Sequence, residues 1–193
     1  MKSPKPSGHR YDAIITLDPA GVQNCGLALR STSGLEGATR GKLRPPTWYA
    51  DDSIWNPPIH DQLAEELMAL VPKGGRVLLV AENAAYKSMI IARSLGKCIG
   101  AVQVTLLSLN VWSTPDTQYI TPSAWRRDML PAAVKDIGEI TNAQKRRAYY
   151  KEAAIRAVAG LYGIETGDNA AEAILLNDHV VLSRKDLWSN VLP

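Results

Sequence analysis

The chain has 193 residues, of which 46% are apolar and 21% are charged, and its formal net charge is +3. This composition is typical of one globular domain and excludes a chain that is disordered throughout, because disordered chains are poorer in apolar residues. No apolar run approaches the roughly 18 residues of a membrane span, and the first ten residues are too polar for a signal peptide. The cysteines, Cys25 and Cys98, form no metal or redox motif, which suits a reducing compartment. We therefore expect a cytoplasmic protein that does not enter a membrane.

The N-terminal part of the chain predicts a flexible basic tail followed by antiparallel strands. Residues 1–10 contain prolines, serines and a glycine and indicate the tail, and residues 11–185 are expected to form a single domain. Three strands of a meander are predicted where apolar and β-branched residues gather, at residues 13–17, 24–30 and 38–43.

Helices and strands then alternate, after a segment at 48–58 that resembles a loop. Helical spacing predicts four helices, which run from Ile59 to Lys73-Gly74-Gly75, over 88–101, from the capping-box pattern at 141–144 to Gly163, and over 168–182. Further strands are predicted at 77–81, 102–109 and 117–120. The expected fold is α/β, with a mixed central sheet (an antiparallel meander plus parallel strands) flanked by helices.

Two acidic residues come directly after predicted strands. Asp18 follows the first strand, and Glu82 follows residues 77–81, which are apolar at every position and predict a strand covered on both faces. If the two strands are neighbours, the carboxylates lie side by side, where they repel each other unless a divalent cation lies between them. The alternative is that each acid caps the turn or helix that follows it.

A third acidic group opens the last predicted helix. Asp168 and Glu172 are four residues apart and share a helix face, with Asn169 on an adjacent line, and alanines around them let the helix approach a sheet closely. Alternatively, Asp168 is an N-cap and Glu172 is solvated. Oxygen ligands without histidine or cysteine favour Mg²⁺ or Mn²⁺ over Zn²⁺. Two such ions about 4 Å apart can activate a water and stabilise the leaving oxygen of a phosphodiester.

A basic stretch accompanies these acids. From Arg126 to Arg156 the chain has eight basic and four acidic residues, which indicates either a polyanion partner or a solvated helix face. Beside an acidic centre, such a surface favours a nuclease. Trp125 is expected either to pack in the core or to stack on a base, and Tyr86 is a candidate for contacting an unstacked base. The residues predicted to contact DNA are Tyr86, Lys87, Arg126, Arg127, Lys145, Arg146 and Arg147.

Six short motifs together resemble the RuvC-type Holliday junction resolvases, a branch of the RNase H-like superfamily, and in particular their divergent phage members. In family order they are Ile15-Thr-Leu-Asp18-Pro-Ala-Gly21 with Cys25-Gly-Leu-Ala-Leu29, Leu79-Val-Ala-Glu82-Asn83, Ala92-Arg-Ser-Leu-Gly96 with Ile99-Gly-Ala-Val102, Tyr119-Ile-Thr-Pro-Ser-Ala-Trp125-Arg-Arg127, Ala143-Gln-Lys145-Arg-Arg147, and Asp168-Asn-Ala-Ala-Glu-Ala173. They cover about residues 11–182.

The resemblance implies a role for each matching residue. Asp18 and Glu82 take the places of metal ligands, and Glu172 takes the place of an aspartate that is followed by alanine. The family's fourth ligand lies three residues before that acid, which here is Asn169, with Asp168 one position earlier; we prefer Asp168 because a carboxylate is the stronger ligand for a hard cation. Lys145 matches a basic residue that faces DNA near the scissile phosphate.

The function expected from these features is a Mg²⁺-dependent endonuclease that resolves four-way DNA junctions with two ions per site, Mn²⁺ substituting for Mg²⁺. Paired nicks on a two-fold symmetric junction imply a homodimer, for which residues 88–101 are the candidate interface. The alternatives are another RNase H-like nuclease, acting on RNA/DNA hybrids or on flaps, and a non-catalytic junction-binding protein. An actin-like phosphotransferase is disfavoured, because 193 residues cannot supply both lobes.

Overall fold

The computed structural model describes residues 9–19, 24–52, 56–83, 89–109, 112–113 and 117–189. In these ranges the strands are β1 (Ala13–Pro19), β2 (Cys25–Ser31), β3 (Trp48–Asp52), β4 (Arg76–Glu82), β5 (Trp112–Ser113) and β6 (Gln118–Ile120). The helices are α1 (Pro57–Leu70), α2 (Met89–Ser108), α3 (Pro122–Met129), α4 (Pro131–Asp136), a 3₁₀ turn (Ile137–Glu139), α5 (Ala143–Tyr162), α6 (Asp168–Ser183) and α7 (Lys185–Trp188).

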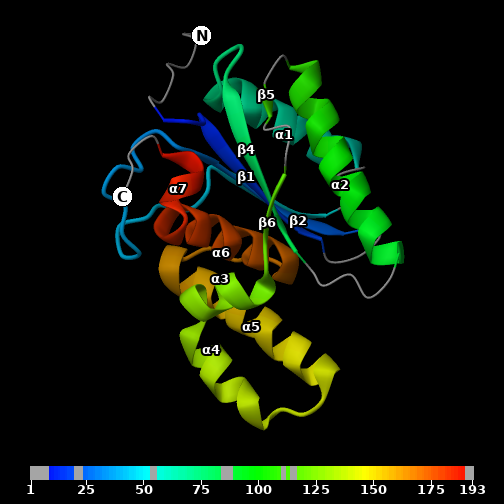
Figure 1. Ribbon diagram of the computed structural model, residues 1–193, viewed down its shortest axis with the longest axis vertical. Coiled ribbons are helices and arrows are strands. Elements are labelled where there is room, and N and C mark those ends of the chain that lie inside the picture. Colours follow the sequence, from blue (N-terminus) through cyan, green and yellow to red (C-terminus); the bar gives the residue numbers. More distant parts are fainter. Residues whose placement is uncertain are drawn as a thin grey trace.

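The strands form one mixed sheet in the order β3-β2-β1-β4-β5, with β6 also pairing with β4 (Figure 1). The β1–β2 and β2–β3 pairs are antiparallel, whereas β4 is parallel to β1, β5 and β6. The expected combination of a meander and parallel strands is therefore confirmed.

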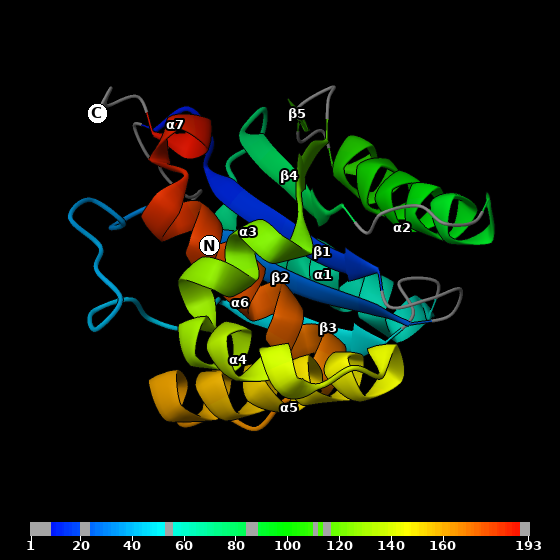
Figure 2. The same ribbon diagram turned by 60° about the horizontal axis from the view of Figure 1, so that its bottom comes forward.

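Helices cover both faces of the sheet, because the central strands are apolar on both sides. Ile15 and Leu17 of β1 pack into a core with α1 and α2, while Ile14 points to the other face, against α3 to α7. Figure 2 shows α5, α4 and α3 beyond α6 on that second face, away from α1 and α2. The sheet is thus buried on both sides, which is typical of strands joined by helical crossovers. No helix in the described ranges has the length and apolar character to cross a bilayer.

Helix α6 lies unusually close to the sheet. Residues from Asn169 to Val181 are all buried, and the hydroxyl of Thr16 in β1 donates a hydrogen bond of 2.8 Å to the carbonyl of Ala173. A Cβ atom on Gly26 would lie 1.9 Å from the carbonyl oxygen of Asn169, so only glycine in β2 permits this approach. The alanines at the start of the helix serve the same purpose, as the sequence predicted.

The third strand of the meander was predicted in the wrong place. Residues 38–43 form turns, in which the amides of Lys42 and Leu43 both donate to the carbonyl of Thr39. The third strand is instead β3, inside the segment that resembled a loop, with Trp48 paired to Leu29. Its aromatic residues suit a pleated surface, and pairing with β2 decides its conformation.

The strand predicted at 102–109 is also wrong, because α2 continues through these residues to Ser108. Val102 and Leu106 are fully buried, while Val104 between them is 62% exposed. A strand would place all three on one face, whereas a helix separates Val104 from the other two. The β-branched residues here were given too much weight, since packing against the sheet overrides their weak preference for strands.

The segment after β6 contains helices that the sequence did not reveal. Helices α3 and α4 each begin with a proline, Pro122 and Pro131, and are too short for a clear helical period. The next helix begins as predicted near residue 142, but its N-cap is Asn142 rather than Thr141. The Asn142 side chain accepts hydrogen bonds from the amides of Gln144 and Lys145.

Candidate active site

Two of the predicted site residues lie at the carboxyl ends of neighbouring parallel strands. Leu17 of β1 pairs with Ala81 of β4, so the next residues along the strands, Asp18 and Glu82, lie side by side. Both are nearly buried, at 5% and 6% exposure, and both project from the face that α6 covers. The row continues across the sheet through Gly26 of β2 to Asp51 of β3.

Helix α6 adds the third carboxylate. Glu172, 3% exposed, lies one turn into the helix and is close enough to Asp18 to raise the pKa of that carboxyl. The close approach of α6 over Gly26 is what brings the helix within reach of the strand ends. Asp18, Glu82 and Glu172 therefore converge, as expected from their positions in the sequence.

Burial and mutual repulsion dominate the electrostatics of these carboxyls. Burial raises the pKa of Asp18 well above its usual value, and the charges of Glu82 and Glu172 raise it further, while Arg126 opposes them. The pKa of Glu82 is likewise raised, first by burial, with Arg126 opposing and Glu172 adding to the shift. Arg126 thus offsets only part of the negative charge of the cluster.

Helix α3 provides two groups that contact these acids. The indole nitrogen of Trp125 donates a hydrogen bond of 2.7 Å to Oε2 of Glu82, and the ring is fully buried. Of the two roles considered for Trp125, core packing is therefore confirmed. Nη2 of Arg126 donates to Oε1 of Glu172 at 2.7 Å and lies 3.8 Å from Oε2 of Glu82.

The two candidates for a fourth ligand have different surroundings. The carboxylate of Asp168 accepts a hydrogen bond from Lys151 of α5. Asn169 is 5% exposed; its Oδ1 accepts from Lys151 at 3.0 Å, and its amide nitrogen donates to Asp51 at 2.7 Å. Asp51 also accepts from the backbone amide of Asn169, so it caps α6 from outside the helix. A Cβ atom on Gly167 would lie 2.0 Å from Asp51, which explains the glycine there.

The predicted DNA-contacting residues are divided between the site and the surface. Arg126 lies inside, and Arg147 is close enough to lower the pKa of Glu82. Arg127, Lys145 and Arg146 are farther out: Arg127 pairs with Asp128, and Arg146 donates to the carbonyl of Ile140.

Helix geometry separates Lys145 from Arg147. Lys145 precedes the buried Ala154 by about two and a half turns and so faces the other way, whereas Arg147 precedes it by about two turns and shares its side. Tyr86 and Lys87 lie outside the described residues.

The donor set suits a hard divalent cation, although its present arrangement is not that of a metal site. In the described ranges, no three His, Cys, Asp or Glu side chains are arranged to hold a metal ion. Yet Asp18 and Glu82 are buried carboxyls whose pKa values are raised by burial and by neighbouring acids, and a cation would stabilise such groups in their ionised form. The contacts of Arg126 with Glu82 and Glu172 reconcile the two observations, because its guanidinium already neutralises part of the charge.

Comparison with known proteins supports the fold. No family model matches the chain, and no curated protein matches it. A solved structure described as "T. thermophilus RuvC in complex with Holliday junction substrate" is similar, with a TM-score of 0.54 and 17% identity over 92% of this chain and 98% of that chain. The fold is RNase H-like. The fold implied by the sequence motifs is thus confirmed.

Within this RNase H-like fold, two contributors to the site were missed in the sequence. Asp51 lies in the segment that resembled a loop, so its place in the row with Asp18 could not be seen. Lys151 belongs to the predicted helix, and helical spacing could have revealed it. Arg147, Tyr150 and Lys151 lie on the same side of α5 as the buried Ala154, one or two turns before it.

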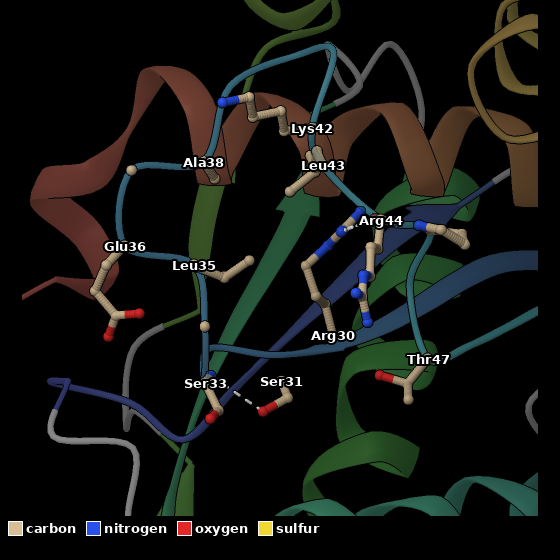
Figure 3. A pocket seen from close by; sticks show the side chains of 13 residues that line it. Arg30, Ser31, Ser33, Leu35, Glu36, Ala38, Lys42, Leu43, Arg44 and Thr47 are labelled. Carbon is tan, nitrogen blue, oxygen red and sulfur yellow. Dashed lines mark hydrogen bonds between the residues drawn. The ribbon is translucent and has the colours of Figure 1, made fainter.

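A cavity of about 520 Å³ lies beside the β2–β3 connection, at the end of the sheet away from the carboxylates. Figure 3 shows Arg30 and Arg44 near each other, and Glu36 and Lys42 at separate points of the loop that joins β2 to β3. It is close to the start of β1, so it is not part of the carboxylate site.

Proposed function

We propose that this protein is a divalent-ion-dependent endonuclease that cuts branched DNA, with the four-way junction as its preferred substrate. The observation that carries the proposal is the convergence of Asp18, Glu82 and Glu172, three buried carboxylates from two strand ends and a helix. The similar structure, RuvC, was solved with a Holliday junction, and the motif order in this chain supports the same substrate class and the phage-type branch of the resolvases. A cytoplasmic location suits such an enzyme.

The proposed ligands of Mg²⁺ are Asp18, Glu82, Glu172 and either Asp168 or Asn169, with two ions per site and Mn²⁺ as a substitute. Bound Mg²⁺ would supply the charge that activates a water and stabilises the leaving 3′ oxygen. Of the two candidates for the fourth ligand, Asn169 is the more buried, whereas the carboxylate of Asp168 is the stronger ligand for a hard cation. Lys151 contacts both side chains. Each would need to exchange its present partner for an ion.

The proposed DNA surface surrounds this centre. Arg147 and Arg126 are nearest to the carboxylates, and Lys145, Arg146 and Arg127 extend the positive charge outward. Such residues bind phosphates without reading sequence. Tyr86 and Lys87, which follow Glu82, are proposed contacts to an unstacked base at the branch point, and Lys145 is proposed to act near the scissile phosphate.

A homodimer is proposed because a four-way junction needs two cuts related by a two-fold axis. On α2, Gly96, Gly100, Val104 and Leu107 follow a helical spacing and form one stripe, with Val104 and Leu107 more than 60% exposed. No described atom comes within 4 Å of a Cβ built on either glycine, so this part of the interface predicted at 88–101 faces open space. Side chains at 89–92 and 94–95 lie outside the description.

The dimer is tested by light scattering at micromolar concentration. Leu107→Glu should give a folded monomer that nicks one strand of a junction, because it places a charge in the stripe. Met68→Glu, at a similarly exposed apolar residue of α1, is the control and should remain dimeric. A wild-type monomer that still makes symmetric paired nicks would refute the dimer.

The substrate class is tested on one gel. A four-way junction, a flap, an RNA/DNA hybrid and a linear duplex are incubated with the protein in Mg²⁺, in Mn²⁺ and in EDTA, with Asp18→Asn as the inactive control. Ion-dependent paired cuts in the junction support the proposal. Preference for the hybrid favours a ribonuclease, and tight junction binding without cleavage favours the non-catalytic alternative; either result overturns it.

A further inference from the structure

The guanidinium of Arg126 contacts two of the carboxylates that are proposed to hold metal ions. Its Nη2 atom donates to Oε1 of Glu172 at 2.7 Å and lies 3.8 Å from Oε2 of Glu82. These are the side chains between which a divalent cation would be held. The arginine and the cation therefore need the same oxygen atoms.

Two aromatic rings hold Arg126 in place. Its Cζ atom lies 5.0 Å from the centre of the Trp125 ring and 4.8 Å from the centre of the Tyr150 ring, so the cation contacts an aromatic residue of α3 and one of α5. The side chain is 20% exposed, which leaves it a route to solvent. The contacts keep the charge beside the acids without fixing every atom.

The hydrogen bonding of Arg126 is incomplete. Its Nε atom is buried and has no hydrogen-bond partner within the described part of the chain. Arg30, by contrast, uses three nitrogens: Nε donates to Asn177, Nη1 to the carbonyl of Arg44 and Nη2 to Asp178. A buried donor without a partner is costly. The facing carboxylates and the two aromatic rings must therefore stabilise Arg126 enough to offset this cost.

There is space for the side chain to leave. A cavity of about 460 Å³ adjoins the site, and Arg126 and Tyr150 are part of its wall together with Asn83, Thr121 and Ser123. A rotation of the Arg126 side chain would move the guanidinium from Glu172 into this cavity. The amide of Asn83 and the hydroxyls of Thr121 and Ser123, which line this cavity, are acceptors for a guanidinium.

We propose that Arg126 is the counter-ion of the ion-free site and is displaced from Glu172 when divalent ions bind. The proposal rests on the proposed function, since it assumes that the carboxylates are the ligands. Without ions, the guanidinium of Arg126 faces three carboxylates. Two divalent ions bring a charge of +4, which satisfies the acids and repels the arginine. Arg126 thus offsets part of the negative charge of the ion-free site and competes with the ions that activate it.

The first test measures Mn²⁺ affinity by electron paramagnetic resonance or calorimetry, in the absence of DNA. Arg126→Gln should bind Mn²⁺ about tenfold more tightly than wild type, because the ion no longer has to break a charge-assisted hydrogen bond. Arg127→Gln is the charge-matched control: its side chain is 76% exposed, one residue away on α3, and its affinity should change less than about twofold. Equal effects of the two substitutions would overturn the displacement.

The second test observes the side chain directly and needs no variant to fold well. In a ¹H–¹⁵N spectrum of the arginine Nε–H groups, the Arg126 signal should move as Mg²⁺ is added, while the signal of Arg30 stays in place as the internal control. An Arg126 signal that is unchanged when Mg²⁺ is saturating overturns the proposal and leaves the nuclease intact. If neither the wild type nor Arg126→Gln binds divalent ions, the proposed function itself is wrong, and this inference with it.

Discussion

Helix α6 buries charged side chains near both of its ends, and the two groups are balanced in different ways. Near the C-terminal end, Asp178 accepts hydrogen bonds from Arg30 at 2.5 Å and from the Tyr162 hydroxyl at 2.7 Å, and Arg30 also donates to Asn177. Each charge there has an opposite charge or a hydrogen-bond partner. Such a closed network needs nothing from outside the protein.

Near the N-terminal end, the balance is not complete. Asp18, Glu82 and Glu172 are opposed mainly by Arg126, with Arg147 also acting on Glu82, and burial together with neighbouring carboxylates raises the pKa values of Asp18 and Glu82. Buried charge that lacks compensation lowers stability and is commonly retained for function. Burial alone therefore does not distinguish a functional site from a structural network, whereas an excess of buried negative over positive charge does.

The sharpest way to break this comparison is Asp18→Asn. We expect cleavage to fall on the order of a thousandfold or more, because a ligand that stabilises the transition state is lost. The ion-free protein should become more stable at neutral pH, by roughly 2–4 °C in Tm for each kcal/mol of repulsion removed. Gel assays and calorimetry in EDTA measure the two effects. A less stable Asp18→Asn protein would indicate that Asp18 is a structural cap.

At the other end of α6, Arg30→Met should lower the stability of the protein and leave cleavage unchanged, the reverse of Asp18→Asn. It leaves Asp178 buried without its cation, which costs about 3–5 kcal/mol, or roughly 10 °C in Tm. Cleavage by the folded protein at low temperature should be unchanged. Adding Asp178→Leu should restore part of the lost stability, because both buried charges are then gone. A double variant as unstable as the single one would contradict the closed-network interpretation.

The pH dependence of stability is expected to have the same sign at both ends of α6, and Asp18→Asn separates the two contributions. Burial raises the folded-state pKa of Asp178 to about 6, so between pH 4 and 6 the folded protein retains a proton that the unfolded chain releases. Stability from this group is therefore highest below about pH 4 and is lost as the pH rises through 6. The raised pKa values of Asp18 and Glu82 act in the same direction. Calorimetry in EDTA should show Tm falling from pH 5 to 7, less steeply in Asp18→Asn.

A smaller effect is expected from the contact between α6 and β2. Gly26→Ala places a methyl group 1.9 Å from the carbonyl of Asn169, so the helix must shift away from Asp18. We expect a loss of about 1–3 kcal/mol in the free energy of unfolding, with a larger proportional loss of cleavage. Gly41→Ala is the control, because a Cβ atom there meets nothing within 4 Å. Full activity in Gly26→Ala would show that the close approach is not needed.

The smallest expected change comes from Trp125→Phe, which removes the hydrogen bond to Glu82. The pKa of Glu82 should rise further, because that bond favours the ionised form. The acidic limb of the pH–rate profile should therefore move to higher pH, a shift that lost packing alone would not produce. An unmoved limb would exclude Glu82 as an ionised participant.

The sequence by itself determined the elements that carry the site. The run of apolar and β-branched residues before Asp18, the apolar run before Glu82 and the alanines around Glu172 are local patterns. Local patterns decide strands, helices and the positions of acids at their ends. The same reasoning led to the mixed sheet, whereas the RNase H-like fold was implied by the resemblance of the six motifs to RuvC-type resolvases, and the comparison with RuvC supports it.

Only the tertiary structure decided which charges meet. Residues 48–52 became a strand because β2 offered an edge, and residues 102–108 stayed helical because the sheet buries Val102 and Leu106 together. In the same way, Arg126 rather than Lys145 contacts the acids, because α3 packs against α6 and α5 turns Lys145 away. Contacts between segments more than forty residues apart depend on how helices pack on the sheet, and that packing has no signature in the local sequence.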